Sequence, residues 1–198
     1  MKYTPLHLLT KKKLEIMPVC SNLVGIPKDC GDNNQGSIKR AALLDYEDLV
    51  SVTLTTGGTA DTDNIASAIS IEVGSQFEEF YFPKDTSSFT QELVQDLAAD
   101  THGFSQTLTL GFRRIDTRKR NAISVLCAGR RDLIALVEDW NGDWWLLGRE
   151  QGLRVTASTM NTQEGRTAGQ LAPITLTGEY EPTMLVKVQT AVAEAFVS

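Results

Sequence analysis

Apolar and polar residues alternate with a period of two in several stretches of the chain. The clearest are residues 49–55 (LVSVTLT), 65–73 (IASAISIEV) and 104–112 (FSQTLTLGF). This pattern predicts β-strands that each bury one face. Gly74 and Ser75 separate the second stretch from an aromatic run at 76–82 (QFEEFYF), so we expect these two strands to form a hairpin.

The strongest local signal lies in residues 131–155, where two β-rich runs flank Asn141 and Gly142. Asn-Gly favours a two-residue type I′ turn, because both central residues of that turn need a positive φ. The stretch therefore predicts an antiparallel hairpin. Residues 171–179 and 183–188 predict two further strands.

Residues 116–128 predict the one clear helix. Asp116 can cap its start, four apolar residues fall on one stripe, and Gly129 can end it. Residues 86–99 fit either a helix or a strand, and residues 189–196 fit a short helix. With eight or nine strands in the chain, we predict a mainly β fold. We expect an antiparallel β-sandwich or partly closed barrel with one flanking α-helix.

The first 40 residues differ from the rest of the chain. Prolines, glycines and the turn-rich run DCGDNNQGS oppose a long helix there, yet the segment holds many aliphatic residues that a disordered tail lacks. We expect an extended N-terminal arm at 1–40, a β-sandwich domain at 41–188 and a C-terminal tail at 189–198. Cys20 and Cys30 either pair in an oxidising setting or stay reduced, and the sequence leaves both open.

Charge and hydropathy narrow the class of protein. The net charge is −6 and the pI about 5.0, so the chain is not expected to grip a phosphate backbone over its whole surface. No run reaches the roughly 18 apolar residues of a membrane span. The N-terminal lysines follow the short apolar patch, in the opposite order to a secretory signal. We expect a protein that is made in a cytoplasm and has no membrane partner.

Residues with catalytic or metal-binding potential are few. The two histidines lack ligand partners at metal-site spacing, and no nucleotide-binding or nucleophile motif is present. The adjacent carboxylates Glu78-Glu79 and Glu138-Asp139 point to opposite faces of a strand, so neither pair can be a catalytic dyad. We expect them to be solvated or turn-flanking charges. The chain is therefore predicted to be no enzyme and to hold no cofactor and no metal.

Two groups of side chains remain candidates for contacts. The basic cluster at 113–120 fits either a nucleic acid or a salt-bridging face toward acidic neighbours, and no aromatic residue interleaves it. Trp140, Trp144 and Trp145 cluster at one hairpin tip, and the last two point to opposite faces of their strand. One of these two rings should enter the core. The other is covered either by a helix or by a partner, since aromatic residues are enriched at interfaces.

The order of these elements resembles that of phage tail tube proteins. The resemblance rests on LTLGFRR, DTRKRNAISVLCAG, LIALVEDWNGDWWLLGREQGLRV, a polar loop and APITLTGEYE, and the earlier CSNLVGIPKDCGDNNQGSIKRAAL looks like the arm and first strand of such proteins. The chain resembles in particular the tail tube proteins of phages and prophages of gut Bacteroidetes, and the resemblance covers residues Val19 to Pro182.

The resemblance implies a virion structural protein that forms rings, usually of six copies. The rings stack into a tail tube, assembled in the host bacterial cytoplasm, through which DNA passes without sequence-specific binding. In this family each subunit gives a long hairpin to a β-barrel around the lumen, and the hairpin expected at 65–82 is the candidate here. Its candidate lumen-facing residues are Glu72, Glu78 and Glu79. Candidate subunit-interface residues are Trp140, Trp144, Trp145, Asp61, Asp63, Arg118 and Arg120.

Two alternatives remain open. The long, aliphatic arm favours a head-tail connector, a tail terminator or a short-tail ring protein as the nearest rival. A monomeric β-sandwich that binds carbohydrate or another adhesion ligand is the second rival, with the three tryptophans as its platform. In the tail reading the partners are further copies of the chain and other phage tail or connector proteins.

Overall fold

The structure of the protein, a computed structural model, describes residues 35–58, 62–96, 101–128, 131–162 and 170–197. The chain divides into two units, Met1–Gly31 and Asp32–Ser198, and all that follows concerns the second. Most of the predicted arm, with Cys20 and Cys30, lies outside the described residues. The first strand begins at Ile38, three residues before the expected start of the sandwich domain at residue 41.

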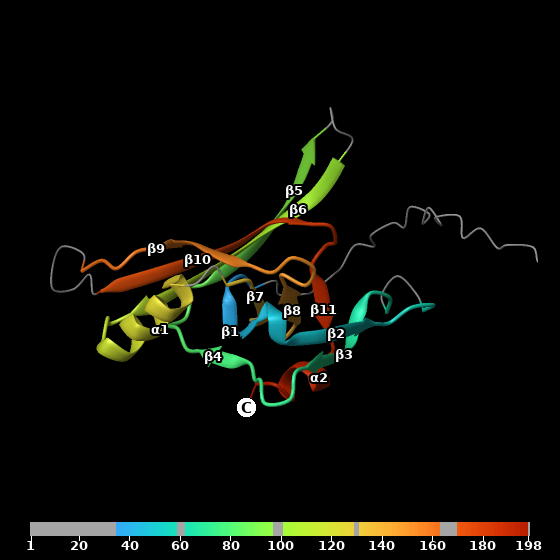
Figure 1. Ribbon diagram of the computed structural model, residues 1–198, viewed down its shortest axis with the longest axis horizontal. Helices are drawn as coiled ribbons and strands as arrows, with labels where there is room; N and C mark the ends of the chain where they lie inside the picture. The colour runs from blue at the N-terminus through green and yellow to red at the C-terminus, as the bar shows by residue number, and fades with distance from the viewer. Residues whose placement is uncertain (1–34, 59–61, 97–100, 129–130, 163–169, 198) are drawn as a thin grey trace, which may run out of the picture. The chain divides into compact units, whose positions relative to one another are not determined.

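Eleven strands form two sheets in the described part of the chain (Figure 1). The larger, sheet A, has the order β2-β3-β11-β8-β7-β1-β4. Its strands are β1 (Ile38–Asp45), β2 (Leu49–Leu54), β3 (Ile65–Ile71), β4 (Glu78–Phe80), β7 (Leu133–Asp139), β8 (Trp144–Leu147) and β11 (Val186–Val188). All neighbouring strands are antiparallel except β11 and β3.

The smaller sheet B has the order β5-β6-β10-β9 and is antiparallel throughout. Its strands are β5 (Ser88–Asp96), β6 (Thr101–Arg113), β9 (Arg154–Ser158) and β10 (Leu171–Glu181). The helices are α1 (Thr117–Ala128), α2 (Thr190–Glu194) and the one-turn 3-10 helix η1 (Tyr46–Asp48). The predicted fold is confirmed: a mainly β sandwich with a flanking helix, in which neither sheet closes into a barrel.

Two hydrophobic cores cover the two faces of sheet A. The upper core lies between the sheets and joins the apolar residues of β6 and β10 to those of β1, β7, β8 and α1. The lower core lies on the other face of sheet A and includes residues of β3, β11 and α2. Successive residues of β7 alternate between the two cores, so this strand reads as an unbroken apolar run (LIALV). A strand buried on both faces loses the polar half of its pattern.

The hairpin expected from residues 65–73 and 76–82 is wrong. β3 pairs with β2 and β11, β4 pairs with β1, and four strands separate β3 from β4 in sheet A. The segment between them carries Phe77, which is 7% exposed and lies 5.4 Å from the ring of Phe196 in the lower core. Burial of this ring draws the chain across the open side of the lower core to the far edge of the sheet.

The predicted hairpin at 131–155 is confirmed as β7 and β8, but its turn type is wrong. Gly142 has a φ of 88°, whereas Asn141 does not have a positive φ. The Gly142 N–H donates to the carbonyl of Asp139 at 3.2 Å, and the Asp139 N–H donates to the carbonyl of Asp143 at 2.9 Å. This is a four-residue turn closed by a glycine bulge. The turn between β7 and β8 is therefore longer than the two-residue turn that Asn-Gly favours.

The remaining local predictions concern the helix α1 and the strands β5 and β1. The helix at 116–128 is confirmed as α1, and Asp116 caps it by accepting the N–H of Lys119 at 2.8 Å. The ambiguous stretch at 86–99 contains a strand, β5, and the first strand, β1, falls at the end of the stretch that resembled an arm and first strand. β5 resolves as a strand because it forms a nine-residue register with β6.

Candidate assembly surfaces

The outer face of sheet B carries hydroxyl groups. Strand register places one row of small side chains across all four strands: Ser88, Thr109, Thr175 and Ala157. The neighbouring row contains Thr90, Thr107 and Thr177, and the Thr177 hydroxyl lies 3.0 Å from that of Thr156. The alternate residues of β6 and β10 face the upper core. On β9 the second row ends at Arg154, which lies opposite Thr177 and forms a salt bridge with Asp132. We call the serine and threonine residues of these two rows the hydroxyl face.

The alternation in FSQTLTLGF and ITLTG predicts strands. The same alternation also specifies the hydroxyl face, because Thr107 and Thr109 of β6 lie opposite Thr177 and Thr175 of β10. The pattern does not predict the pairing of β6 with β10, and this pairing brings the two sets of threonines together on one face of the sheet.

Sheet B has two open edges. Within the described residues β5 and β9 each pair on one side only, so their outer backbone N–H and C=O groups have no strand partner. The pairing of β10 with β6 ends at Phe104, whereas β5 and β6 continue to pair as far as Asp96 and Thr101. The β5–β6 hairpin thus extends beyond its sheet (Figure 1). Leu93 lies opposite Phe104, where this extension begins, and is 61% exposed.

The turn between β7 and β8 is organised by one carboxylate. Asp139 accepts the backbone N–H groups of Asn141 and Asp143 at 2.8 and 2.9 Å, and the indole N–H of Trp145 at 3.1 Å. The amide of Asn141 in turn binds the backbone N–H and C=O of Gln35. The point at which the described chain begins is therefore held against this turn.

The three tryptophans do not form one exposed strip. Trp144 is 1% exposed and belongs to the lower core, where the guanidinium of Arg40 stacks on its ring at 4.9 Å. Trp145 packs on the upper core, with its ring 6.3 Å from that of Phe89. Trp144 is thus a core residue of the subunit and not a surface residue, contrary to its choice as an interface candidate. Only Trp140 remains beside an open hollow.

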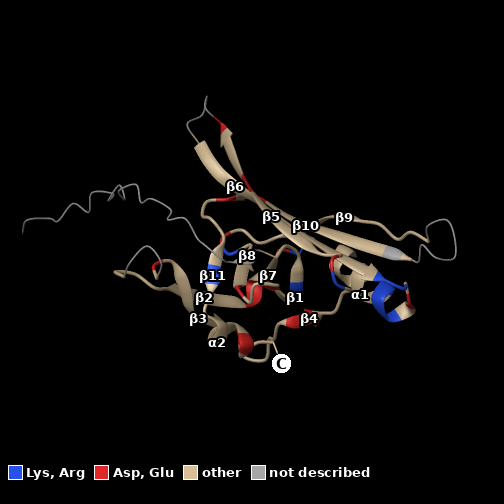
Figure 2. Cartoon of the chain, turned by 180° about the vertical axis from the view of Figure 1, so that it is seen from behind, with Lys and Arg blue, Asp and Glu red and all other residues tan. Residues whose placement is uncertain are grey.

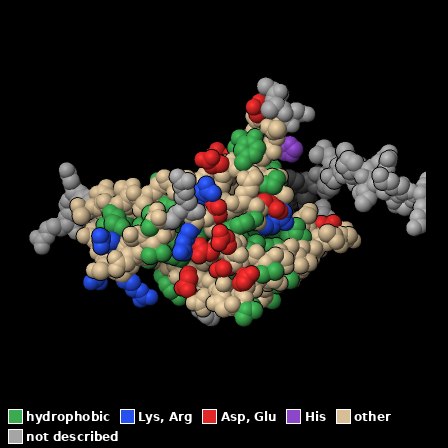
Figure 3. Space-filling view, viewed as in Figure 1, with side chains coloured by type: hydrophobic (Ala, Val, Ile, Leu, Met, Phe, Trp, Pro, Cys, Tyr) green, Lys and Arg blue, Asp and Glu red, His purple; other side chains and the backbone are tan. Residues whose placement is uncertain are grey.

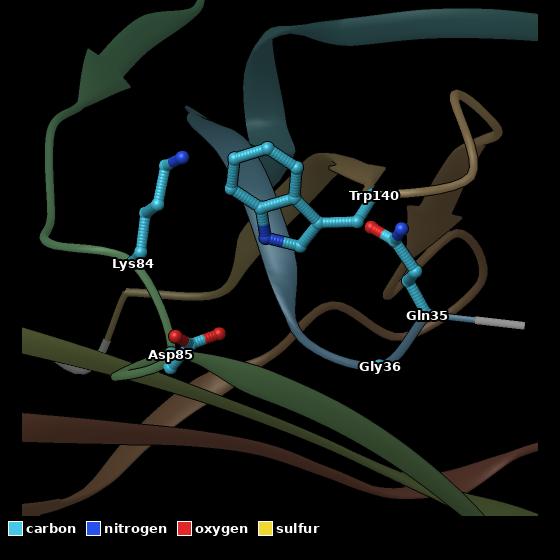
Figure 4. A pocket seen from close by; sticks show the side chains of 5 residues that line it. All are labelled: Gln35, Gly36, Lys84, Asp85 and Trp140. Atoms are coloured by element: carbon cyan, nitrogen blue, oxygen red, sulfur yellow. The ribbon is translucent and has the colours of Figure 1, made fainter.

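That hollow, of about 390 Å³, is lined by Gln35, Gly36, Lys84, Asp85 and Trp140 (Figure 4). The Lys84 ammonium lies 4.7 Å from the centre of the Trp140 ring. The indole nitrogen of Trp140 is buried and has no hydrogen-bond partner within the described residues. A buried donor of this kind is satisfied when a carbonyl or carboxylate oxygen enters the hollow.

Basic side chains gather at the start of α1 (Figure 2). The basic helix surface consists of Arg113, Arg114, Arg118, Lys119 and Arg120. The Lys119 ammonium donates to the carbonyls of Arg113 and Arg114 at 2.8 and 3.0 Å, which fixes the start of the helix on the end of β6. Both sequence candidates from this cluster, Arg118 and Arg120, are exposed.

The candidate lumen residues are not brought together. Glu72 follows β3, whereas Glu78 and Glu79 lie on β4 at the opposite edge of sheet A. They cannot line one hairpin, since that hairpin does not exist. Asp63 accepts the N–H of Gly58 at 2.7 Å within the β2–β3 loop. Asp61 lies outside the described residues.

A second acidic group surrounds η1. The N–H of Glu72 donates to the carbonyl of Asp48 at 2.9 Å, which places Glu72 beside Glu47 and Asp48. We call these three residues the acidic surface; none of them forms a salt bridge within the part of the chain that is described. Burial raises the pKa of the neighbouring Tyr46, and the carboxylates of Glu150, Glu181 and Asp132 raise it further. Figure 3 shows acidic side chains gathered near the middle of one face.

The sequence did not identify Glu138 and Glu181 as buried carboxylates. Glu138 is 5% exposed and accepts hydrogen bonds from the side chains of Lys39 at 2.7 Å and Arg40 at 2.5 Å. The prediction that it is a solvated charge is therefore wrong. Burial opposes its ionisation, but these two hydrogen bonds prevail and its pKa lies below the ordinary value. Glu181 is 1% exposed and accepts the N–H groups of Glu150 and Gln151, and burial raises its pKa.

Neither carboxylate forms part of a metal cluster. Across the described ranges no three histidine, cysteine or acidic side chains come together in a way that would hold a metal ion. No helix in these ranges is long and apolar enough to cross a membrane.

The comparisons with known proteins add no family to this description. No protein-family model matches the chain, and searches of curated proteins and of solved structures find no similar protein.

Proposed function

We propose that this chain is a virion structural protein whose copies assemble into rings, and that the rings stack into a phage tail tube through which DNA is ejected. The ring is a homo-oligomer, with six copies as the expected number. The protein acts by assembly and not by catalysis, and its place is the tail of the virion.

The observation that carries this proposal is the hydroxyl face of sheet B with its two open edges. If β5 of one copy pairs with β9 of the next, the ladder of backbone hydrogen bonds continues from copy to copy. A sheet closed in this way leaves no edge exposed. β5 offers nine residues and β9 offers five, so about 17 Å of strand can pair between copies.

The chemistry of the hydroxyl face suits a channel for DNA. Binding to the phosphate backbone is driven mainly by lysine and arginine, which release counterions. A wall of serine and threonine attracts phosphate little and repels it little, so DNA slides along it. In this proposal the wall is the hydroxyl face, in place of the acidic hairpin expected from the sequence.

Assembly is tested first with the unmodified chain. We expect light scattering at rising concentration to show masses that are multiples of 21.7 kDa, and negative-stain images to show rings or tubes with a central hole. A particle of 21.7 kDa at every concentration would contradict the proposal.

The identity of the wall is tested by adding charge to it. In the variant Thr107→Lys/Thr175→Lys, two cations enter neighbouring strands of the hydroxyl face. We expect its assemblies to retain double-stranded DNA that wild-type assemblies release. The matched control, Ser51→Lys/Thr53→Lys, adds the same charge to exposed positions of β2 in sheet A and should leave DNA retention unchanged. Equal retention by both variants would place the wall elsewhere.

A further inference from the structure

The outward side of α1 has no partner within the described residues. The helix packs on the upper core through Ile123, which is 5% exposed, and through Leu126. Arg113, Arg114, Arg118 and Arg120 form no salt bridge within the described chain. On the same helix Val125 is 57% exposed. A concentration of positive charge around an exposed apolar side chain is unusual on the surface of a chain with a net charge of −6.

Charge complementarity identifies the occupant. The acidic surface of the same chain offers Glu47, Asp48 and Glu72, which are likewise without salt bridges. A nucleic acid fits less well, because no aromatic residue interleaves the arginines and the rest of the protein repels phosphate. We propose that the basic helix surface of one copy docks on the acidic surface of a second copy.

This contact uses a different surface from the one proposed to close the ring, and it rests on that ring assembly. The open edges of β5 and β9 lie at the two sides of sheet B. α1 instead packs on the upper core through Ile123, beneath β9 and β10 (Figure 1). A copy bound at the outward side of α1 therefore adds a contact that the pairing of the sheet edges does not use.

The test is an exchange of charge between the two surfaces in the full chain. One variant, Arg118→Glu/Arg120→Glu, reverses the basic helix surface, and a second, Glu47→Lys/Glu72→Lys, reverses the acidic surface. All four positions are exposed, so both variants should fold, which circular dichroism checks. The control Arg118→Lys/Arg120→Lys keeps the charge. Association is measured by sedimentation velocity at about 0.1 M and about 1 M salt, over which the screening length falls from about 10 Å to about 3 Å.

We expect each reversed variant alone to associate at least about tenfold more weakly than wild type at low salt, since each loses and inverts two exposed ion pairs. An equimolar mixture of the two should recover association, because the reversed surfaces are again complementary. The lysine control should behave like wild type, and high salt should remove the difference between wild type and each variant.

Three results would overturn the inference. The reversed helix variant could associate as wild type does while still forming rings, in which case the proposed function stands and this contact falls. It could lose affinity for double-stranded DNA that wild type binds, which makes phosphate the occupant. Wild type could remain a monomer throughout, in which case the proposed function falls and this contact falls with it.

Discussion

Replacement of Glu138 by glutamine tests whether a buried carboxylate holds the start of β1 on the end of β7. Glu138 is 5% exposed and accepts hydrogen bonds from the side chains of Lys39 and Arg40 on the neighbouring strand β1. A hydrogen bond to a charged group contributes about 1.5–3 kcal/mol. The side chains of Lys39 and Arg40 are 44% and 31% exposed, so both regain water when the carboxylate is lost. Glutamine also keeps one acceptor oxygen. We therefore expect a loss of about 2 kcal/mol in the free energy of unfolding.

Urea denaturation at low protein concentration and neutral pH measures this loss. With a slope of about 2 kcal/mol per molar urea, the midpoint should fall by about 1 M. The matched control is Glu194→Gln on α2, whose side chain is exposed, and its midpoint should not move.

A pH series adds an independent check. The folded-state pKa of Glu138 lies below its ordinary value of 4.5, so its contribution is present above pH 4.5 and is lost as the pH falls through the folded pKa. The difference between wild type and Glu138→Gln should therefore narrow in acid. A difference under about 0.5 kcal/mol at neutral pH, or one that persists unchanged in acid, would refute the reasoning.

Three further predictions concern the turns and the second buried acid. Gly142→Ala should lower the free energy of unfolding by about 1 kcal/mol, because φ is 88° and nothing lies within 4 Å of a new Cβ. Gly148→Ala should lower it clearly more in the same urea assay, because its Cβ would meet a backbone oxygen at 3.0 Å. Equal losses would contradict this reasoning. Asp139→Ala should lower stability by about 2 kcal/mol and shift the fluorescence of Trp145, whose indole loses its acceptor; an unchanged spectrum would argue against that hydrogen bond. Burial raises the pKa of Glu181, so in an NMR titration its carboxyl carbon should titrate above 4.5, and stability should gain as the pH falls through that folded pKa. Titration at or below 4.5 would show that the two backbone N–H donors outweigh burial.

Local structure was largely predictable from the sequence. The period-two stretches became β2, β3 and β6, and the helix at 116–128 became α1 with the expected cap at Asp116. These features depend on residues close in sequence, whose alternation or capping chemistry acts within a few positions. The hairpin of β7 and β8 belongs to the same class, since its two strands are joined by one short turn.

Contact surfaces were much less predictable. Trp144 and Trp145 were expected on opposite faces, and they are, but both faces of their sheet are covered, so alternation did not place either ring outside. Glu138 was expected to be a solvated or turn-flanking charge, but it is buried. Its burial follows from the pairing of β7 with β1, which brings two cations across from it.

Side-chain periodicity and capping act locally, so the order of residues along the chain is enough to predict which segments are strands and which are helices. The choice of neighbouring strands depends on tertiary packing. The backbone edges of all strands present the same N–H and C=O groups, so partner choice depends on the side chains that each pairing buries. For β4 that choice follows Phe77, whose ring enters the lower core and carries the chain away from β3 to β1. The hydroxyl face likewise exists only because β6 and β10, far apart in sequence, align their threonines in one sheet.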